Sequence, residues 1–169
     1  MRVLVAYGSK MGGTAEMAEW VADGLRGTGH EADVVDGKAC KSIEGYEAVI
    51  VGGGLYANRW AKGARRFVKR HRTGLVAVPV WGFSSGPLND DAAEVDIPPT
   101  DAVDAFLDSV HARGHKTFGG RLTEDPGWFP ASSMAEEMAG DWRDRTAVVG
   151  WAAAIGEELR TLGATTRSG

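Results

Sequence analysis

The sequence predicts an α/β fold, a doubly wound five-stranded parallel sheet in strand order 2-1-3-4-5 with helices on both faces. Two observations carry this prediction. Short apolar runs alternate with longer segments of helical periodicity along the 169 residues. Some of these runs, such as residues 3–7 (VLVAY), are apolar throughout, which is typical of strands buried on both faces. Right-handed crossovers leave few other topologies.

Each element follows from the same patterns. We expect strands at residues 3–7, 31–35, 47–51, 79–83 and 116–122, bounded by glycine, proline or polar residues. We expect helices at residues 13–25, 61–73, 101–112 and 145–162, where apolar positions recur three or four residues apart. Gly27 or Gly29 should end the first helix and Gly74 the second, and Thr100 should cap the third. Residues 38–44 should form a loop or one helical turn, residues 84–99 a long loop, and residues 123–144 an irregular segment.

Composition and length indicate one domain over residues 1–163, followed by a disordered tail at residues 164–169. No apolar run approaches the ~20 residues of a membrane span, and the N-terminus shows no signal-peptide pattern. The single cysteine, Cys40, excludes an internal disulfide and fits a reducing compartment, so we expect a cytoplasmic location. The net charge of −4 argues against a nucleic-acid partner.

The loop between the first strand and the first helix has the composition of an anion site. It contains Ser9, Lys10, Met11, Gly12, Gly13 and Thr14. The N–H groups at a helix N-terminus favour negative charge, and glycine lets a phosphate approach the backbone. Hydroxyl and ammonium groups add further donors. The alternative is that this loop is rich in glycine and hydroxyl groups for helix capping alone.

Two further loops should lie at the same edge of the sheet, where strands three and four end. Residues 52–60 are glycine-rich and carry Tyr56 and Trp60, and residues 84–88 are Ser84, Ser85, Gly86, Pro87 and Leu88. A phosphate loop beside an aromatic loop suits a ligand with an anionic end and a flat end. Flavin mononucleotide (FMN) has both.

With these motifs in place, the sequence resembles the flavodoxin-like superfamily, and within it the menaquinone-dependent protoporphyrinogen oxidases and related flavodoxin-domain proteins. The resemblance rests on the Ser9–Thr14 loop, residues 49–52 with the aromatic loop, residues 66–71 and residues 141–152. It implies a flavodoxin-like three-layer sandwich that binds FMN. Two departures bear on the function. Met11 stands where the family usually has a hydroxyl residue, and residues 123–144 are shorter than the helical insertion of those oxidases.

The resemblance implies three groups of cofactor contacts. Phosphate contacts would come from Ser9, Lys10, Met11, Gly12, Gly13 and Thr14. Ring contacts would come from Gly54, Leu55, Tyr56, Ala57 and Asn58, and a second wall from Ser84, Ser85, Gly86, Pro87 and Leu88. No side chain is expected to act as a catalytic acid or base. No metal site is expected, because the four histidines lack metal-ligand spacing.

Four functions stay open at this point. The first is an electron carrier or a flavin-dependent oxidoreductase acting on a small molecule. The second is a quinone-linked protoporphyrinogen dehydrogenase, and the third is a partner-binding domain of this fold that has lost its flavin. The fourth is a hydrolase, because residues 82–86 (GFSSG) match a nucleophile-elbow pattern. A long loop follows this motif instead of a helix, and we expect His111 and His115 to lie away from the strand ends.

Charged and apolar segments suggest where partners would bind. Seven of the nineteen basic residues fall within residues 59–72, on a predicted helix. They form either a solvated face or a docking surface for a redox partner protein or a peripheral membrane contact. A quinone-type small molecule is the other partner class that we expect. Residues 126–138 are apolar for a loop and would form either a packed lid or a mobile cover for a flat substrate. The sequence leaves the oligomeric state open.

Overall fold

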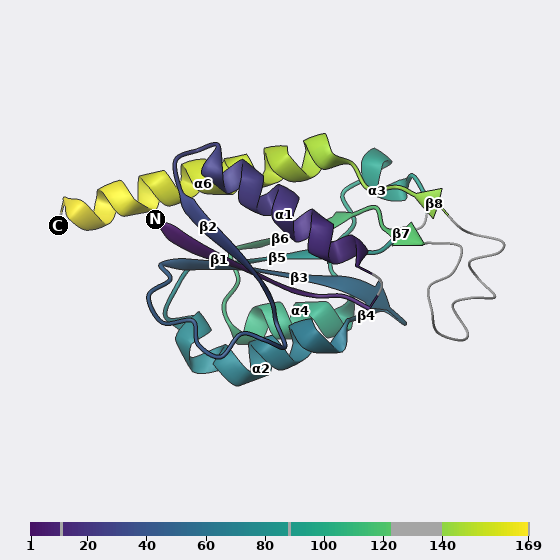
Figure 1. The fold of residues 1–169 in the computed structure, drawn as a ribbon, viewed down its shortest axis with the longest axis horizontal. Helices are drawn as coiled ribbons and strands as arrows, with labels where there is room; N and C mark the ends of the chain where they lie inside the picture. Colours follow the sequence, from purple (N-terminus) through teal and green to yellow (C-terminus); the bar gives the residue numbers. More distant parts are fainter. Residues whose placement is uncertain (11, 88, 123–139, 169) are drawn as a thin grey trace.

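The computed structural model describes residues 1–10, 12–87, 89–122 and 140–168, and it is a three-layer α/β/α sandwich (Figure 1). The parallel strands are β1 (Arg2–Gly8), β2 (Glu31–Asp36), β3 (Ala48–Tyr56), β5 (Val80–Ser85) and β6 (Gly114–Phe118). They lie in the order β2-β1-β3-β5-β6. The predicted order 2-1-3-4-5 is confirmed. The fourth and fifth parallel strands are labelled β5 and β6 because a short strand, β4 (Arg59–Trp60), precedes them in the chain. β4 pairs antiparallel with β3.

Helices cover both faces of the sheet (Figure 1). α1 (Gly13–Arg26) and α6 (Arg145–Arg167) lie on one face, and α2 (Lys62–Val76) and α4 (Asp101–Ser109) lie on the other. The short α3 (Asp91–Glu94) follows β5. β7 (Arg121–Leu122) and β8 (Gly140–Asp141) form a separate antiparallel pair. The apolar segment at residues 126–138 lies outside the described residues.

Alternation along the central strands divides the interior into two cores. In β1, Val3 and Val5 pack with α1 and α6, whereas Leu4 and Ala6 pack with α2 and α4. All four side chains are fully buried. A strand of this kind must be apolar at every position, which is why its sequence shows a continuous run instead of an alternating one.

Glycine packing accounts for two differences from the expected boundaries. β3 continues through Gly52–Gly54 to Tyr56, although we expected a loop there, because Gly53 lies directly beneath Trp60. A Cβ atom at Gly53 would lie 2.5 Å from the indole. Likewise, α2 passes through Gly74, whose Cβ would lie 2.7 Å from Ile43, and ends at Val76. These glycines allow close packing and do not end an element.

Other boundaries also differ from expectation. Thr100 caps α4 by accepting the Val103 N–H at 3.4 Å, as predicted, but the helix ends at Ser109 and His111 takes a positive φ of 55°. β6 ends at Phe118, and the rest of the expected fifth strand contributes to β7. α3 lies within the expected loop at 84–99.

The last helix is longer than expected. It ends at Arg167 instead of Leu162, so it includes residues 164–167 of the segment that we expected to be disordered. No glycine or proline interrupts these residues, and Thr165 donates its hydroxyl hydrogen to the carbonyl of Thr161 at 3.1 Å. The Thr165 side chain is thus bonded to the preceding turn of the same helix.

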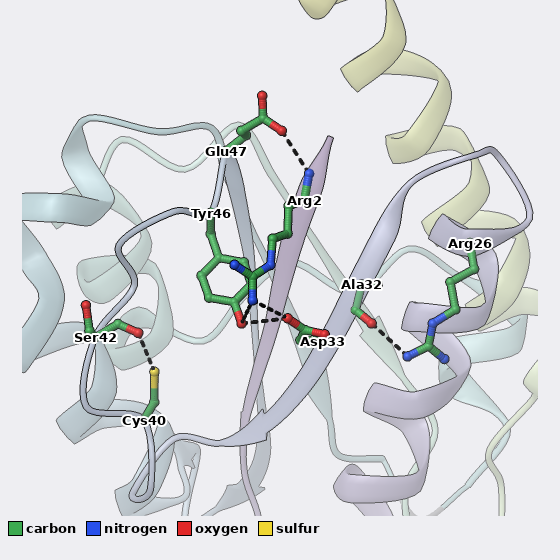
Figure 2. Close-up of polar contacts among 8 residues, drawn as sticks. All are labelled: Arg2, Arg26, Ala32, Asp33, Cys40, Ser42, Tyr46 and Glu47. Carbon is green, nitrogen blue, oxygen red and sulfur yellow. Dashed lines mark hydrogen bonds and ion pairs between the residues drawn. The ribbon is translucent and has the colours of Figure 1, made fainter.

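Polar contacts at the amino-terminal end of the sheet hold β1 against its neighbours (Figure 2). The Arg2 guanidinium lies 3.1 Å from the Asp33 carboxylate on β2, and the Tyr46 hydroxyl donates to the same carboxylate at 2.7 Å. These hydrogen bonds, with Tyr46 the largest influence, hold the pKa of Asp33 below its usual value. The Glu47 carboxylate accepts the Arg2 backbone N–H at 2.9 Å. These contacts therefore lie at the end of the sheet opposite to the predicted cofactor loops.

Glycine substitutions on the packed and open sides of α1 and α6 should have opposite effects on stability. A Cβ at Gly24 would lie 2.5 Å from the Val149 carbonyl and 2.7 Å from the Ala152 Cβ, so Gly24→Ala must displace α6. We expect this substitution to lower the free energy of unfolding by about 1–3 kcal/mol. Among the residues that the structure describes, none lies within 4 Å of a Cβ placed at Gly150. Gly150→Ala should therefore raise the same free energy by about 0.5–1 kcal/mol through helix propensity.

Urea unfolding followed by circular dichroism measures both values. If Gly24→Ala matched Gly150→Ala, the close packing of α1 on α6 would be wrong.

Candidate functional site

The three predicted loops meet at the carboxyl-terminal edge of the sheet. Tyr7 and Gly8 at the end of β1 pair with Gly52 and Gly53 of β3. Gly53 and Gly54 pair in turn with Ser84 and Ser85 of β5. The register therefore brings the Ser9–Thr14 loop, the end of β3 and the end of β5 side by side. Met11 and Leu88, which belong to the predicted site, lie outside the described residues.

The loop after β1 presents the N-terminus of α1. The Ser9 Oγ accepts the Gly12 N–H at 2.9 Å, and Gly12 takes a left-handed conformation (φ 81°) that glycine adopts without strain. Gly13 and Thr14 begin the helix and are buried. Within the described residues, neither of their N–H groups has a hydrogen-bond acceptor, and no side chain caps the helix. These donors, with the helix dipole, form an environment suited to an anion.

Arg121 is a site residue that the sequence did not indicate. β7 places its side chain over the start of α1, so that a Cβ at Gly13 would lie 3.8 Å from its Nε. A Cβ at Gly12 would lie 3.9 Å from its Nη2. The two glycines therefore leave room beside a guanidinium group at the end of the helix. Arg121 is more than a hundred residues away from this loop, and only the pairing of β7 with β8 gives it this position.

Arg143 supports the same loop from β8's side and is almost fully buried, with 4% of its side chain exposed. Its Nη1 donates to the Gly13 carbonyl at 3.2 Å and lies 2.7 Å from the Glu16 carboxylate. Its Nη2 lies 2.8 Å from the Asp141 carboxylate. Hydrogen bonding from Arg143 holds the pKa of Asp141 below its usual value, and the Asp141 carboxylate raises the pKa of Arg143. Since two carboxylates neutralise Arg143, it positions the loop, and Arg121 is the cation that faces the helix end.

The end of β3 folds back as a hairpin that carries Tyr56. The Tyr56 hydroxyl accepts the Lys10 N–H at 3.2 Å, and the Lys10 Nζ lies 4.9 Å from the centre of the ring. Ala57 and Asn58 form the turn with positive φ angles of 50° and 61°, a conformation that costs non-glycine residues energy. The Thr100 hydroxyl donates to the Asn58 carbonyl at 2.7 Å and holds this turn against α4. The aromatic ring therefore lies against the anion loop.

The remaining predicted residues line the edge between these two loops. Gly54 lies beneath Tyr56, since its Cβ would be 3.0 Å from the Tyr56 ring and 3.1 Å from the Thr14 hydroxyl. Leu55 packs against Gly86, whose Cβ would be 2.6 Å from the Leu55 Cδ1. Ser85 is 8% exposed.

The chain after β5 is tied to the segment after β6. The Gly86 N–H donates to the Phe118 carbonyl at 3.1 Å, and the Pro87 carbonyl accepts the Gly120 N–H at 2.9 Å. These two bonds fix the second wall of the edge through backbone groups. The backbone of Gly86 and Pro87 is therefore held in a fixed position at the edge where a ligand would bind.

Trp60 and His115 occupy positions that differ from our expectations. Trp60 is 1% exposed, stacks with Phe106 at 6.4 Å between ring centres and donates its indole N–H to the Ser84 Oγ at 2.9 Å. It is therefore a core residue and leaves Tyr56 as the aromatic side chain of the hairpin at the edge. His115 lies on β6 beside β5, and its Nε2 is 2.9 Å from the Ser84 Oγ. We expected it away from the strand ends, and the parallel register of β5 and β6 overturns this expectation.

The Ser84 hydroxyl joins two rings in this cluster. It accepts the indole N–H of Trp60, which can only donate, and shares a second hydrogen bond with Nε2 of His115, whose direction depends on the tautomer of the imidazole. Burial lowers the pKa of His115 to about 4, although the charge of Asp96 opposes this shift. The other ring nitrogen, Nδ1, is buried and has no hydrogen-bond partner within the described part of the chain.

This geometry does not support the hydrolase alternative. A nucleophile elbow exposes its serine, whereas Ser84 is 1% exposed and its hydroxyl is used on both sides. No carboxylate among the described residues accepts from Nδ1 of His115, so the third member of a triad is missing there.

Cys40 and His71, which lie near each other in the fold, have structural roles. The Cys40 thiol is buried, which raises its pKa. Figure 2 shows the thiol directed at the Ser42 carbonyl, 3.4 Å away. His71 places Nε2 3.1 Å from the Cys40 carbonyl and its ring 4.9 Å from that of Phe67. Both residues help to hold the segment after β2 against α2.

Two other kinds of feature are absent from the described residues, a cluster of metal ligands and a membrane-spanning helix. In the ranges that the structure describes, no group of three or more His, Cys, Asp and Glu side chains could hold a metal ion. No helix in those ranges is long and apolar enough to cross a membrane.

Comparison with known proteins gives one family. Residues 4–143 match the family described as the flavodoxin domain. A stretch of 86 residues is 28% identical to protoporphyrinogen IX dehydrogenase [quinone] of Escherichia coli K12. That stretch is 50% of this chain and 48% of the enzyme, so the chain spans about half the length of the curated relatives it matches.

Solved structures show the same fold. A flavodoxin from the domain Archaea gives a TM-score of 0.64 at 14% identity, over 95% of this chain and 99% of that one. A cysteine-to-serine variant of the flavodoxin from Pseudomonas aeruginosa gives 0.60 at 16% identity, with the same coverage. At these identities the likeness concerns the fold alone.

The low pKa of His115 predicts a pH-dependent loss of stability. Between about pH 6.5 and pH 4 the unfolded chain binds a proton at this histidine that the folded chain does not bind. The free energy of unfolding should therefore fall as the pH is lowered through this window, by up to about 3 kcal/mol from this residue. In His115→Gln, whose amide group can still hydrogen-bond to Ser84 in either direction, this part of the loss should disappear.

Urea unfolding at about pH 7 and about pH 4.5 measures the difference. His111→Asn is the matched control, because residue 111 is exposed and asparagine tolerates its positive φ. An unchanged pH dependence in His115→Gln would show that His115 is protonated in the folded protein.

Proposed function

Because the chain belongs to the flavodoxin domain family, we propose that it binds FMN at the carboxyl-terminal edge of its sheet and acts as a flavin-dependent redox protein. The observation that carries the proposal is the uncapped N-terminus of α1: the Gly13 and Thr14 N–H groups have no acceptor among the described residues, and the Arg121 guanidinium lies beside Gly12 and Gly13. Such a set of donors suits a phosphate monoester.

The residues present fit the phosphate end of FMN. Gly12 and Gly13 leave the backbone accessible, and a side chain at either position would enter the space beside Arg121. Ser9 holds the loop open through its bond to the Gly12 N–H. Thr14, which is 3% exposed, offers a hydroxyl next to Gly54. The loss of a hydroxyl residue at position 11 is offset in this proposal by the charge of Arg121.

The hairpin fits the flat end of the same ligand. Tyr56 is held at the end of β3 by a turn that α4 anchors, so its ring has a defined position against which an isoalloxazine can pack. When bound, FMN supplies hydride or single-electron transfer, and the protein supplies binding and orientation.

Flavin titration tests the proposal directly. Purified flavin-free protein should quench FMN fluorescence on binding and should bind riboflavin, which lacks the phosphate, much more weakly. Thr14→Val and Arg121→Gln should each weaken FMN binding by on the order of 1.5–3 kcal/mol, because each removes a charge-assisted hydrogen bond. Binding of riboflavin should be unaffected by either substitution.

Arg160→Gln, on the exposed side of α6, controls for the change in net charge. If FMN and riboflavin bound equally, the phosphate would not be held at α1. If neither bound, the chain would be a partner-binding domain with this fold.

A second candidate function has one observation in its favour. The 86-residue match to protoporphyrinogen IX dehydrogenase [quinone] suggests that the electrons come from a porphyrinogen and pass to a quinone. Under anaerobic conditions, FMN-loaded protein supplied with protoporphyrinogen IX and a soluble naphthoquinone should then form fluorescent protoporphyrin faster than free FMN does. A rate equal to that of free FMN would show that protoporphyrinogen IX is not a substrate, and it would not contradict the general redox function.

A further inference from the structure

A groove lined by positive charge lies between the turn after β2 and the outer face of α2. It encloses about 530 Å³ and is lined by Gly37, Lys38, Arg66, Lys69 and Arg70. All four basic side chains are exposed at its rim. This groove shares no lining residue with the FMN site proposed above.

The sequence builds the groove from both sides. Arg66, Lys69 and Arg70 are spaced three and four residues apart, so they lie on one face of α2. Gly37 lets the turn lie directly against the helix, because a Cβ there would be 2.7 Å from the Gly63 carbonyl. The stem of Lys38 then runs along α2, 3.2 Å from the position of a Gly63 Cβ. The Lys38 ammonium thus joins the cations of the helix.

These four charges are not neutralised by the described part of the protein. No ion pair in that part joins any of them to a carboxylate, and α2 contains no acidic residue. Asp36, the nearest acidic residue in sequence, accepts the backbone N–H of Lys38 at 2.9 Å. By contrast, Arg113 and Arg143 elsewhere in the fold are each paired with a carboxylate. The groove therefore collects positive charge in a chain whose net charge is −4.

We propose that this groove binds a phosphorylated small molecule that carries at least two phosphate groups, such as a nucleoside diphosphate or a dinucleotide. Arginine guanidinium groups bind phosphate oxygens in pairs, and lysine adds a mobile point charge. Four cations match the charge of two phosphate groups. The volume falls within the range of small-molecule sites.

The shape of the surface favours a small ligand over a membrane. The charges surround a recess between a turn and a helix, whereas a lipid surface needs a ridge or plane. The large apolar residues of α2 other than Val76 at its C-terminal end are buried in the core, among them Phe67 and Val68, so the face that carries the cations has no apolar side to insert among lipids. Phosphate is common to a free nucleotide and a lipid headgroup, and the test separates the two.

Isothermal titration with pyrophosphate and with adenosine 2′,5′-bisphosphate tests the proposal on the full chain. Wild-type protein should bind both at low ionic strength. The double variant Arg66→Gln/Arg70→Gln should bind about tenfold more weakly, since two charge-assisted contacts are removed. The matched double variant Arg72→Gln/Arg160→Gln removes the same charge outside the groove and should stay within about twofold of wild type.

Two further arms keep this test independent of the FMN proposal. In a Thr14→Val background, which weakens phosphate binding at α1, the Arg66→Gln/Arg70→Gln double substitution should still cause about the same tenfold loss of pyrophosphate affinity, because the groove is separate from α1. This holds whether or not FMN binds. The proposal is overturned if wild-type protein binds neither probe or if both double variants lose affinity equally. It is also overturned if phosphatidylglycerol vesicles, and not the soluble probes, bind in an Arg66- and Arg70-dependent way.

Discussion

Burial of the central strands on both faces is the constraint on which the rest of this structure depends. β1 and β3 are apolar at nearly every position, so each face of the sheet must be covered by helices. Parallel strands covered in this way send all their connecting loops to the two edges. The carboxyl-terminal edge then receives the loops after β1, β3 and β5 together. The candidate site is a consequence of this packing as much as of the residues in the loops.

Backbone spacing at this edge is set by glycine. Gly53 admits the indole of Trp60, and Gly54 admits the side chain of Tyr56. A larger residue at either position would separate the hairpin from the sheet. The hydrogen bonds between Trp60 and Ser84 and between Ser84 and His115 then tie the hairpin to β5 and β6. This cluster gives the edge its rigidity and leaves Tyr56, outside it, to face a ligand.

Electrostatic neutralisation separates the basic residues into two groups. Arg143 is buried and paired with Glu16 and Asp141, so its charge serves the fold. Desolvation of such a cation is tolerable only with partners of this kind. The cations around Lys38 and Arg66 have no carboxylate partner in the described structure and remain in contact with water. Exposed cations without a carboxylate partner contribute little to the stability of the fold, and they are available to bind ligands.

Local patterns in the sequence were sufficient for the strand order, for the four longer helices and for the position of the Ser9–Thr14 loop before α1. Thr100 was recognised as a cap because capping depends on residues only a few positions apart. The same local reasoning failed where glycine serves packing, as at Gly53 and Gly74, because a glycine that ends an element and one that admits a distant side chain look alike in sequence.

Only the tertiary structure placed Arg121 beside Gly12 and Gly13, put His115 against Ser84 and buried Trp60. Each of these contacts joins residues at least 24 positions apart, across strands whose register no local pattern specifies. The sequence by itself determined the five parallel strands, the four longer helices and the edge of the sheet at which their loops gather. The folded chain decided which side chains reach those loops, because that depends on register and on packing between layers.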